Sequence, residues 1–144
     1  MTTRLLLATA ATGLVTSLVT GLVTAPPAQA AYPSPNSTYK GSYDVDGDDF
    51  EAFITVKIGA DKKKVAKVTA KVTCPGKDKP LRITWKNMSI GSTGAWSQMK
   101  KKKGQFFAEI RGIFGSSSAV SGELNFFQSQ CDPYQYFGWD ALKK

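Results

Sequence analysis

The chain has no histidine, only two cysteines, and three leucines after its first 30 residues. Histidine is the usual general base near neutral pH and the commonest imidazole ligand to metals. Its absence therefore excludes Ser-His-Asp hydrolases and zinc sites built on histidine. The scarcity of leucine, beside many Val, Ile, Thr and aromatic residues, favours strands over helices. We expect a β-protein that is not an enzyme, with no catalytic residues, no cofactor and no metal site.

The first 30 residues differ in composition from the rest and predict a cleaved secretory signal peptide. Arg4 precedes an apolar stretch from Leu5 to Val23, and the segment ends in Ala28-Gln29-Ala30. Signal peptidase requires small residues one and three positions before the cut, so we place cleavage between Ala30 and Ala31. A membrane anchor is the alternative for an apolar stretch of this length, but no Lys/Arg cluster follows it. We therefore expect a secreted, extracellular protein.

Export places the two cysteines in an oxidising environment, where we expect Cys74 and Cys131 to form a disulfide. On the loop-entropy model, a bond that closes so long a loop stabilises the fold by about 4 kcal/mol. A catalytic thiol is the alternative. It is disfavoured because the chain has no histidine to form a thiolate pair.

From Tyr39 onward, apolar and polar residues alternate between turn signals, a pattern typical of an antiparallel sheet. In the clearest case, one face of the segment 65–74 carries Ala66, Val68, Ala70, Val72 and Cys74, and the other carries lysines and threonines. Similar patterns cover 50–58, 80–88, 105–114 and 119–128.

These patterns predict an all-β fold: a small antiparallel barrel or sandwich of about seven strands with one disulfide. Residues 31–38 are rich in Pro and Ser and predict a flexible lead-in, and residues 39–144 form a single β-domain. Between Asp44 and Glu51 lies an Asp-x-Asp-x-Asp motif like that of a calcium loop. The loop's required Gly and bidentate Glu are replaced by Asp49 and Thr55, so we favour a hairpin turn and keep a weak calcium site as the alternative.

The order of several short motifs resembles a group of small exported β-domain proteins of high-GC Gram-positive bacteria. The motifs are Tyr39-x-Gly41, Cys74, Gly94-Ala95-Trp96, Ile110-x-Gly112-x-Phe114, Ala119-x-x-Gly122, Cys131 and Trp139-x-Ala141. Trp96 stands where the group has Phe. The group carries no assigned activity, so the resemblance implies export, β-structure and the disulfide, and no chemistry.

Positive charge is concentrated in the middle of the chain. Residues 57–103 contain 14 Lys and Arg against two Asp, and the whole chain has a formal charge of +8. Two runs dominate: Lys62, Lys63 and Lys64, and then Lys100, Lys101, Lys102 and Lys103. In one interpretation these lysines keep hairpin ends and strand edges soluble. In the other they bind an anionic cell-surface polymer or polysaccharide, or DNA without sequence recognition, through point-charge attraction.

Aromatic residues gather near the end of the chain, in Tyr134-Gln135-Tyr136-Phe137-Gly138-Trp139. If exposed, these rings could stack on sugars together with Trp85 and Trp96. If buried, they supply the core of a domain that has few leucines. Both interpretations stay open at the level of sequence.

We therefore expect an exported noncatalytic binding or structural domain of unknown ligand, whose basic face is a candidate for binding anionic polymers. A carbohydrate-binding module that uses the C-terminal aromatics is the alternative function, and a small secreted hydrolase is the second. Glu109 and Glu123 fall at outward strand positions, where we expect them to pair with lysines on neighbouring strands. The sequence leaves the oligomeric state open.

Overall fold

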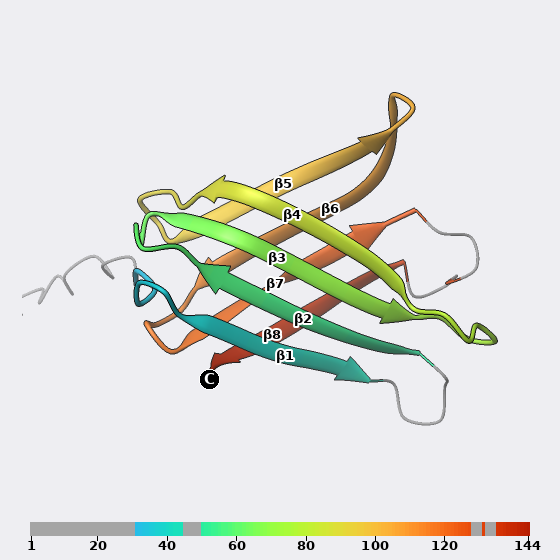
Figure 1. Cartoon of the computed structure of the whole chain (residues 1–144), viewed down its shortest axis with the longest axis horizontal. Helices are drawn as coiled ribbons and strands as arrows, with labels where there is room; N and C mark the ends of the chain where they lie inside the picture. Colours follow the sequence, from blue (N-terminus) through green and yellow to red (C-terminus); the bar gives the residue numbers. More distant parts are fainter. Residues whose placement is uncertain (1–30, 45–49, 128–130, 132–134) are drawn as a thin grey trace, which may run out of the picture.

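The computed structural model describes residues 31–44, 50–127, 131 and 135–144. They form eight antiparallel strands, an all-β fold as predicted (Figure 1). The strands are β1 (Thr38–Asp44), β2 (Glu51–Ile58), β3 (Lys64–Thr73), β4 (Leu81–Ser89), β5 (Ala95–Lys102), β6 (Gln105–Phe114), β7 (Ala119–Phe126) and β8 (Tyr136–Lys143).

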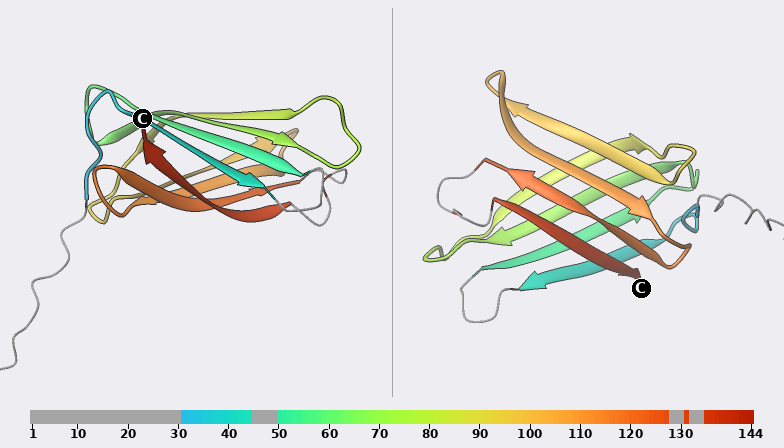
Figure 2. Two further views of the ribbon diagram at one scale, coloured as in Figure 1. Left: turned by 90° about the horizontal axis from the view of Figure 1, so that it is seen from below. Right: turned by 180° about the vertical axis from the view of Figure 1, so that it is seen from behind.

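The strands form one sheet in the order β4-β3-β2-β1-β8-β7-β6-β5, curled into a nearly closed barrel. Figure 2 shows β1–β4 and β5–β8 as two facing layers. The layers join through a short ladder of β1 and β8, in which Tyr39 pairs with Lys143 and Lys40 with Leu142. At the other side, β4 and β5 share no ladder within the described residues, and the Lys86 N–H donates to Gln98 Oε1 at 3.3 Å. Of the two architectures that the sequence allowed, the barrel is the one formed.

A glycine in β1 makes the junction between the layers possible. A Cβ at Gly41 would lie 1.8 Å from the backbone oxygen of Asp140 in β8. The backbone of β8 therefore crosses β1 at a distance that only glycine permits.

The core follows the predicted alternation, with two local shifts. In β2, within the segment 50–58 where alternation was predicted, Ala52, Ile54, Val56 and Ile58 are all buried. In β3 the prediction for Ala66 was wrong: Ala66 is half-buried and Val65 is buried instead. A bulge shifts the register opposite Ile58, and an extra residue of this kind reverses the inward side upstream of it. In β4, Asn87 has a φ of 57°, and the buried positions move on to Met88.

The eighth strand, β8, comes from the aromatic segment near the end of the chain, which the sequence did not mark as a strand. It alternates buried Phe137, Trp139 and Ala141 with exposed Gly138 and Asp140. The Phe137 ring stacks on Tyr43, with centroids 5.0 Å apart. The aromatic residues of this segment that face inward therefore belong to the core.

Of the predicted flexible lead-in 31–38, residues 31–37 contact one end of the barrel and Thr38 begins β1. Asn36 donates its backbone N–H to the Gly59 carbonyl at 3.0 Å, and Ile58 donates to the Ser37 carbonyl at 2.9 Å. Pro33 and Ser37 are buried. The turn after β2 thus packs against the residues that precede β1.

The predicted disulfide between Cys74 and Cys131 is present, and both cysteines are buried. It links the residue after β3 to the segment between β7 and β8, and so ties one layer of the barrel to the other.

We predict that the native protein has no titratable thiol and that Cys74→Ser or Cys131→Ser lowers the free energy of unfolding by about 4 kcal/mol. The bond joins residues 57 positions apart in the sequence and so restricts the unfolded chain. Removing it restores the conformational entropy of the unfolded chain, which lowers the stability of the fold. Denaturant unfolding measures the loss, and a reductant should destabilise the native protein by a similar amount while leaving the Cys74→Ser/Cys131→Ser double variant unaffected. Two reactive thiols in the native protein would contradict the bond.

A row of four residues crosses the layer β5–β8 on its inner face. Trp96 pairs with Gly112, Gly112 with Gly122, and Gly122 with Trp139. Both indoles are buried and lie over the glycines, since a Cβ at Gly112 would lie 2.2 Å from the Trp96 ring and one at Gly122 2.5 Å from the Trp139 ring. The ring centroids are 6.0 Å apart. The two glycines thus make room for the two largest side chains of this layer.

We predict that Gly122→Ala destabilises the protein by about 1–3 kcal/mol, the usual cost of overpacking a filled core. The added Cβ would also lie 2.0 Å from the Arg111 carbonyl oxygen, which is backbone and cannot rotate away. Gly115→Ala is the matched control, because a Cβ there meets nothing within 4 Å and its cost should stay within about 0.5 kcal/mol. Equal thermal midpoints for the two variants would contradict this account of the row.

Candidate functional site

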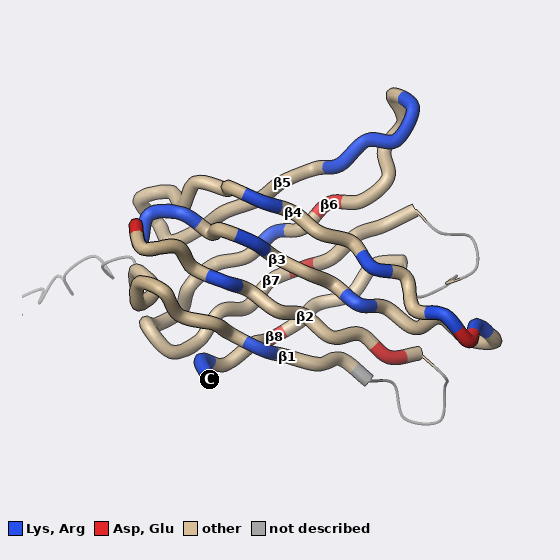
Figure 3. Tube along the Cα trace, in the orientation of Figure 1, with Lys and Arg blue, Asp and Glu red and all other residues tan. Residues whose placement is uncertain are grey.

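The outer surface of β2, β3 and β4 carries a concentration of positive charge that the strand register orders into rows (Figure 3). Lys57 pairs with Lys67, and Lys67 with Lys86. Lys71 pairs with Arg82 four residues farther along β3 and β4. We call these five side chains the lysine face. The three strands contain one carboxylate, Glu51, and none of the five makes an ion pair with another described residue.

The position of two of these lysines separates the two interpretations of the basic charge. Lysines that protect a sheet from edge pairing belong on edge strands. Lys57 and Lys67 lie on β2 and β3, which are hydrogen-bonded on both sides. Like charges directly opposite each other on paired strands destabilise a sheet. Edge protection therefore does not explain why Lys57 and Lys67 lie opposite each other on these two strands.

A groove of about 290 Å³ runs between the two rows of the lysine face. Its floor includes Thr55 and Thr69, which pair across β2 and β3, and the next residue in that row is Thr84 of β4. Phe53 continues the row of Lys71 and Arg82 on β2, with Lys71 Nζ 5.9 Å from its ring centroid. Hydroxyl donors on the floor and cations on both walls suit a chain of anionic groups that lies across the strands.

The lysine runs singled out in the sequence lie at opposite ends of the strands and do not form one continuous patch. Lys62 and Lys63 lie in the β2–β3 hairpin, with Lys64 at the start of β3, and extend the lysine face at that end. Lys100 to Lys102 end β5, and Lys103 begins the turn after it with a φ of 52°. Because β5 runs away from the β4–β5 turn, which contacts Lys63, this second run lies at the far end.

The lysine face was missed because its members are isolated in the sequence. The signal that could have found it is register. Lys57 and Lys67 lie at outward positions on the two sides of one predicted hairpin turn, and Lys86 is outward on the next strand. Pairing these strands places the three side chains in line.

The structure tests the prediction for the aromatic segment and leaves most of the acidic loop undescribed. Residues 45–49 lie outside the described residues, and no group of three potential metal ligands occurs in the part of the chain that the structure describes. Trp85, Trp96 and Trp139 are 0–4% exposed and so offer no ring to a sugar, which confirms their assignment to the core. Tyr136 is 58% exposed, and Tyr134 is outside the described residues.

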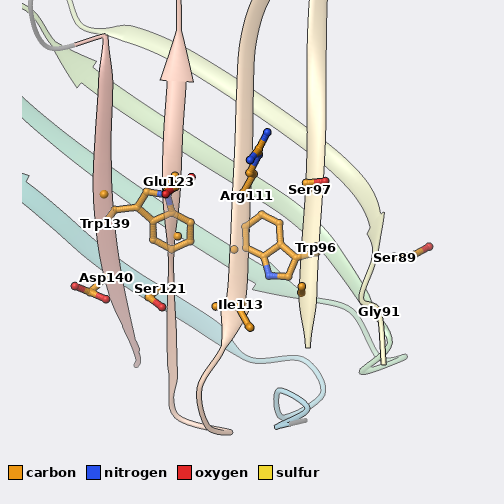
Figure 4. Close-up of a pocket in the computed structure, with 14 residues that line it drawn as sticks. Ser89, Gly91, Trp96, Ser97, Arg111, Ile113, Ser121, Glu123, Trp139 and Asp140 are labelled. Carbon is orange, nitrogen blue, oxygen red and sulfur yellow. The ribbon is translucent and has the colours of Figure 1, made fainter. Parts of the chain in front are cut away.

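A second polar surface lies outside β5–β8, over the row of tryptophans and glycines (Figure 4). We call this hollow of about 890 Å³ the outer trough. One wall follows the pairs Ser97–Arg111, Arg111–Glu123 and Glu123–Gly138, and the other follows Ala95–Ile113, Ile113–Ser121 and Ser121–Asp140. The trough therefore crosses four paired strands, with small side chains at half of its wall positions.

Ion pairing and hydrogen bonding fix the polar groups at one wall of the outer trough. Arg111 donates through Nε and an Nη to the two oxygens of Glu109, at 3.1 and 3.2 Å. This hydrogen-bonded pair raises the pKa of Arg111. The hydrogen bond of Tyr136 to Glu123 raises the pKa of the phenol above its ordinary value of 10.0. The predicted partners of the two glutamates were lysines, and the structure provides an arginine and a tyrosine.

No family model, curated protein or solved structure matches this chain. The described residues include no helix that is long and apolar enough to cross a membrane. The function is therefore inferred from the chemistry of the two outer surfaces.

Proposed function

We propose that the protein is an exported noncatalytic binding domain that holds a linear anionic polymer on its lysine face. The observation that supports this function is the in-register row Lys57–Lys67–Lys86, which opposes like charges on two inner strands without a carboxylate partner. Folding tolerates that repulsion, and binding an anion relieves it.

The geometry suits a polymer better than a single small anion. Neighbouring strands are about 4.8 Å apart, so the cations of one row repeat at the spacing of the strands. The groove lies between two such rows and is open at the surface, and Lys62 to Lys64 continue the charge at one end. A chain with a phosphate, sulfate or carboxylate on each repeat could contact several lysines at once, as a cell-surface polymer would.

The predominance of lysine sets the character of the binding. Four of the five cations of the lysine face are lysines, which attract anions as point charges and make few bidentate contacts. We expect binding of moderate affinity that depends on charge density more than on the chemical identity of the polymer.

We predict that the protein binds heparin or inorganic polyphosphate at low salt and releases both by a few hundred millimolar salt, where the Debye length is ~5 Å. The variant Lys57→Gln/Lys67→Gln/Lys86→Gln should bind about tenfold or more weakly. Its plot of log affinity against log salt should be less steep by about 2, because fewer counterions are released. Isothermal titration at several salt concentrations measures both quantities.

The matched control is Lys101→Gln/Lys102→Gln/Lys103→Gln, which removes the same charge from the tip of the β5–β6 hairpin. It should reduce affinity less than threefold. The lysine-face variant should be as stable as the native protein or more so, since its mutations remove opposed charges. Equal affinity losses in the two variants would show that net charge alone attracts the polymer and would contradict a site on β2–β4.

A further inference from the structure

The outer trough is a second candidate binding site, separate from the lysine face. It lies on the opposite layer of the barrel, on β5–β8, and is about three times the volume of the groove on the lysine face. Its length across four strands is about 14 Å, three strand spacings of about 4.8 Å. It therefore has room for a short linear ligand that lies across the sheet.

The floor of the trough is a consequence of the core packing beneath it. Gly112 and Gly122 are required on the inner face by the two indoles, so the backbone here packs directly against the rings. On the outer face, Gly138, Ser97 and Ser121 leave the walls low between the longer side chains. A ligand here would meet a preformed surface, so little conformational entropy would be lost on binding.

The polar groups of the trough need a ligand that both donates and accepts hydrogen bonds. Glu123 and Asp140 offer acceptors, while Arg111 and the serine hydroxyls offer donors. Arg111 is held flat by its bidentate pair with Glu109, and its side chain is 61% exposed. Ile113, which is 46% exposed, adds an apolar surface beside these groups. Sugars match this combination, because each ring carries hydroxyls that donate and accept, and a face of C–H groups.

Charge and topology exclude the other common linear ligands. An anionic polymer would be repelled by Glu109, Glu123 and Asp140, which outnumber the single cation Arg111. An extended peptide binds a sheet by adding to a free edge, whereas the strands under the middle of the trough, β6 and β7, are paired on both sides. From the trough's size and polarity, and because the strands under its middle have no free edge, we propose that it binds an uncharged linear oligosaccharide.

The test titrates the protein with three neutral tetrasaccharides, cellotetraose, chitotetraose and maltotetraose, at about 0.5 M salt, where the lysine face is screened. We expect at least one to bind with a dissociation constant on the order of 0.1–1 mM. Gly138→Gln should weaken that binding at least tenfold by filling the trough. A Cβ at Gly138 meets only the Gly122 carbonyl, at 3.8 Å, so the variant should fold.

Gly115→Gln is the matched control, because it adds the same side chain to an exposed turn with nothing within 4 Å of the new Cβ, and it should bind like the native protein. Glu123→Gln should also weaken binding, and it should lower the pKa of Tyr136 toward its ordinary value, which confirms that the side chain is in place. The lysine-face triple variant should bind the sugar as tightly as the native protein does. The experiment therefore tests the sugar site independently of the proposed polymer site. Unaltered binding by Gly138→Gln, or no binding of any of the three sugars at about 10 mM, would overturn the proposal.

Discussion

The packing of Trp96 and Trp139 against Gly112 and Gly122 is the contact on which the layer β5–β8 depends. A shift of one residue in any of the three ladders would turn an indole outward or place a side chain where a ring now lies. The indole N–H groups of Trp96 and Trp139, like that of Trp85, are buried and have no hydrogen-bond partner among the described residues, which costs free energy. Burial of the large apolar rings offsets this cost. The row thus fixes the register of four strands and, through that register, every outward side chain on them.

The inward side chains of each strand form the core, so the outward side chains are the ones that can contact a ligand. The two layers differ in the charge of these outward side chains. On β2–β4 the register opposes lysine with lysine, which concentrates positive charge on this face. On β6–β8 it opposes Arg111 with Glu123, and because Arg111 is already paired with Glu109, carboxylates outnumber the cation on this face. The two proposals therefore assign an anionic polymer to one face of the barrel and a neutral sugar to the other.

How much the sequence could predict depended on whether a feature is local. The alternation in β2 and the presence of two cysteines in a chain expected to be exported were enough for the all-β fold and the disulfide. The bulge beside Val65 and the strand β8 were missed, because a bulge leaves no signal in an alternating run and Gly138, although it lies within β8, is a residue typical of turns. The lysine face and the outer trough depend on which residues pair across strands. For residues such as Lys57 and Gly112, which are isolated in the sequence, only the register shows which side chains lie beside them.

The most direct test of the proposed function is a map of backbone amide chemical shifts during titration of the protein with inorganic polyphosphate at low salt. The account predicts that the largest shifts fall on alternate, outward residues of β2, β3 and β4, centred on Lys57, Lys67 and Lys86, and that the amides of β6 and β7 stay unchanged. Shifts confined to the β5–β6 hairpin, or spread evenly over every lysine of the chain, would contradict it.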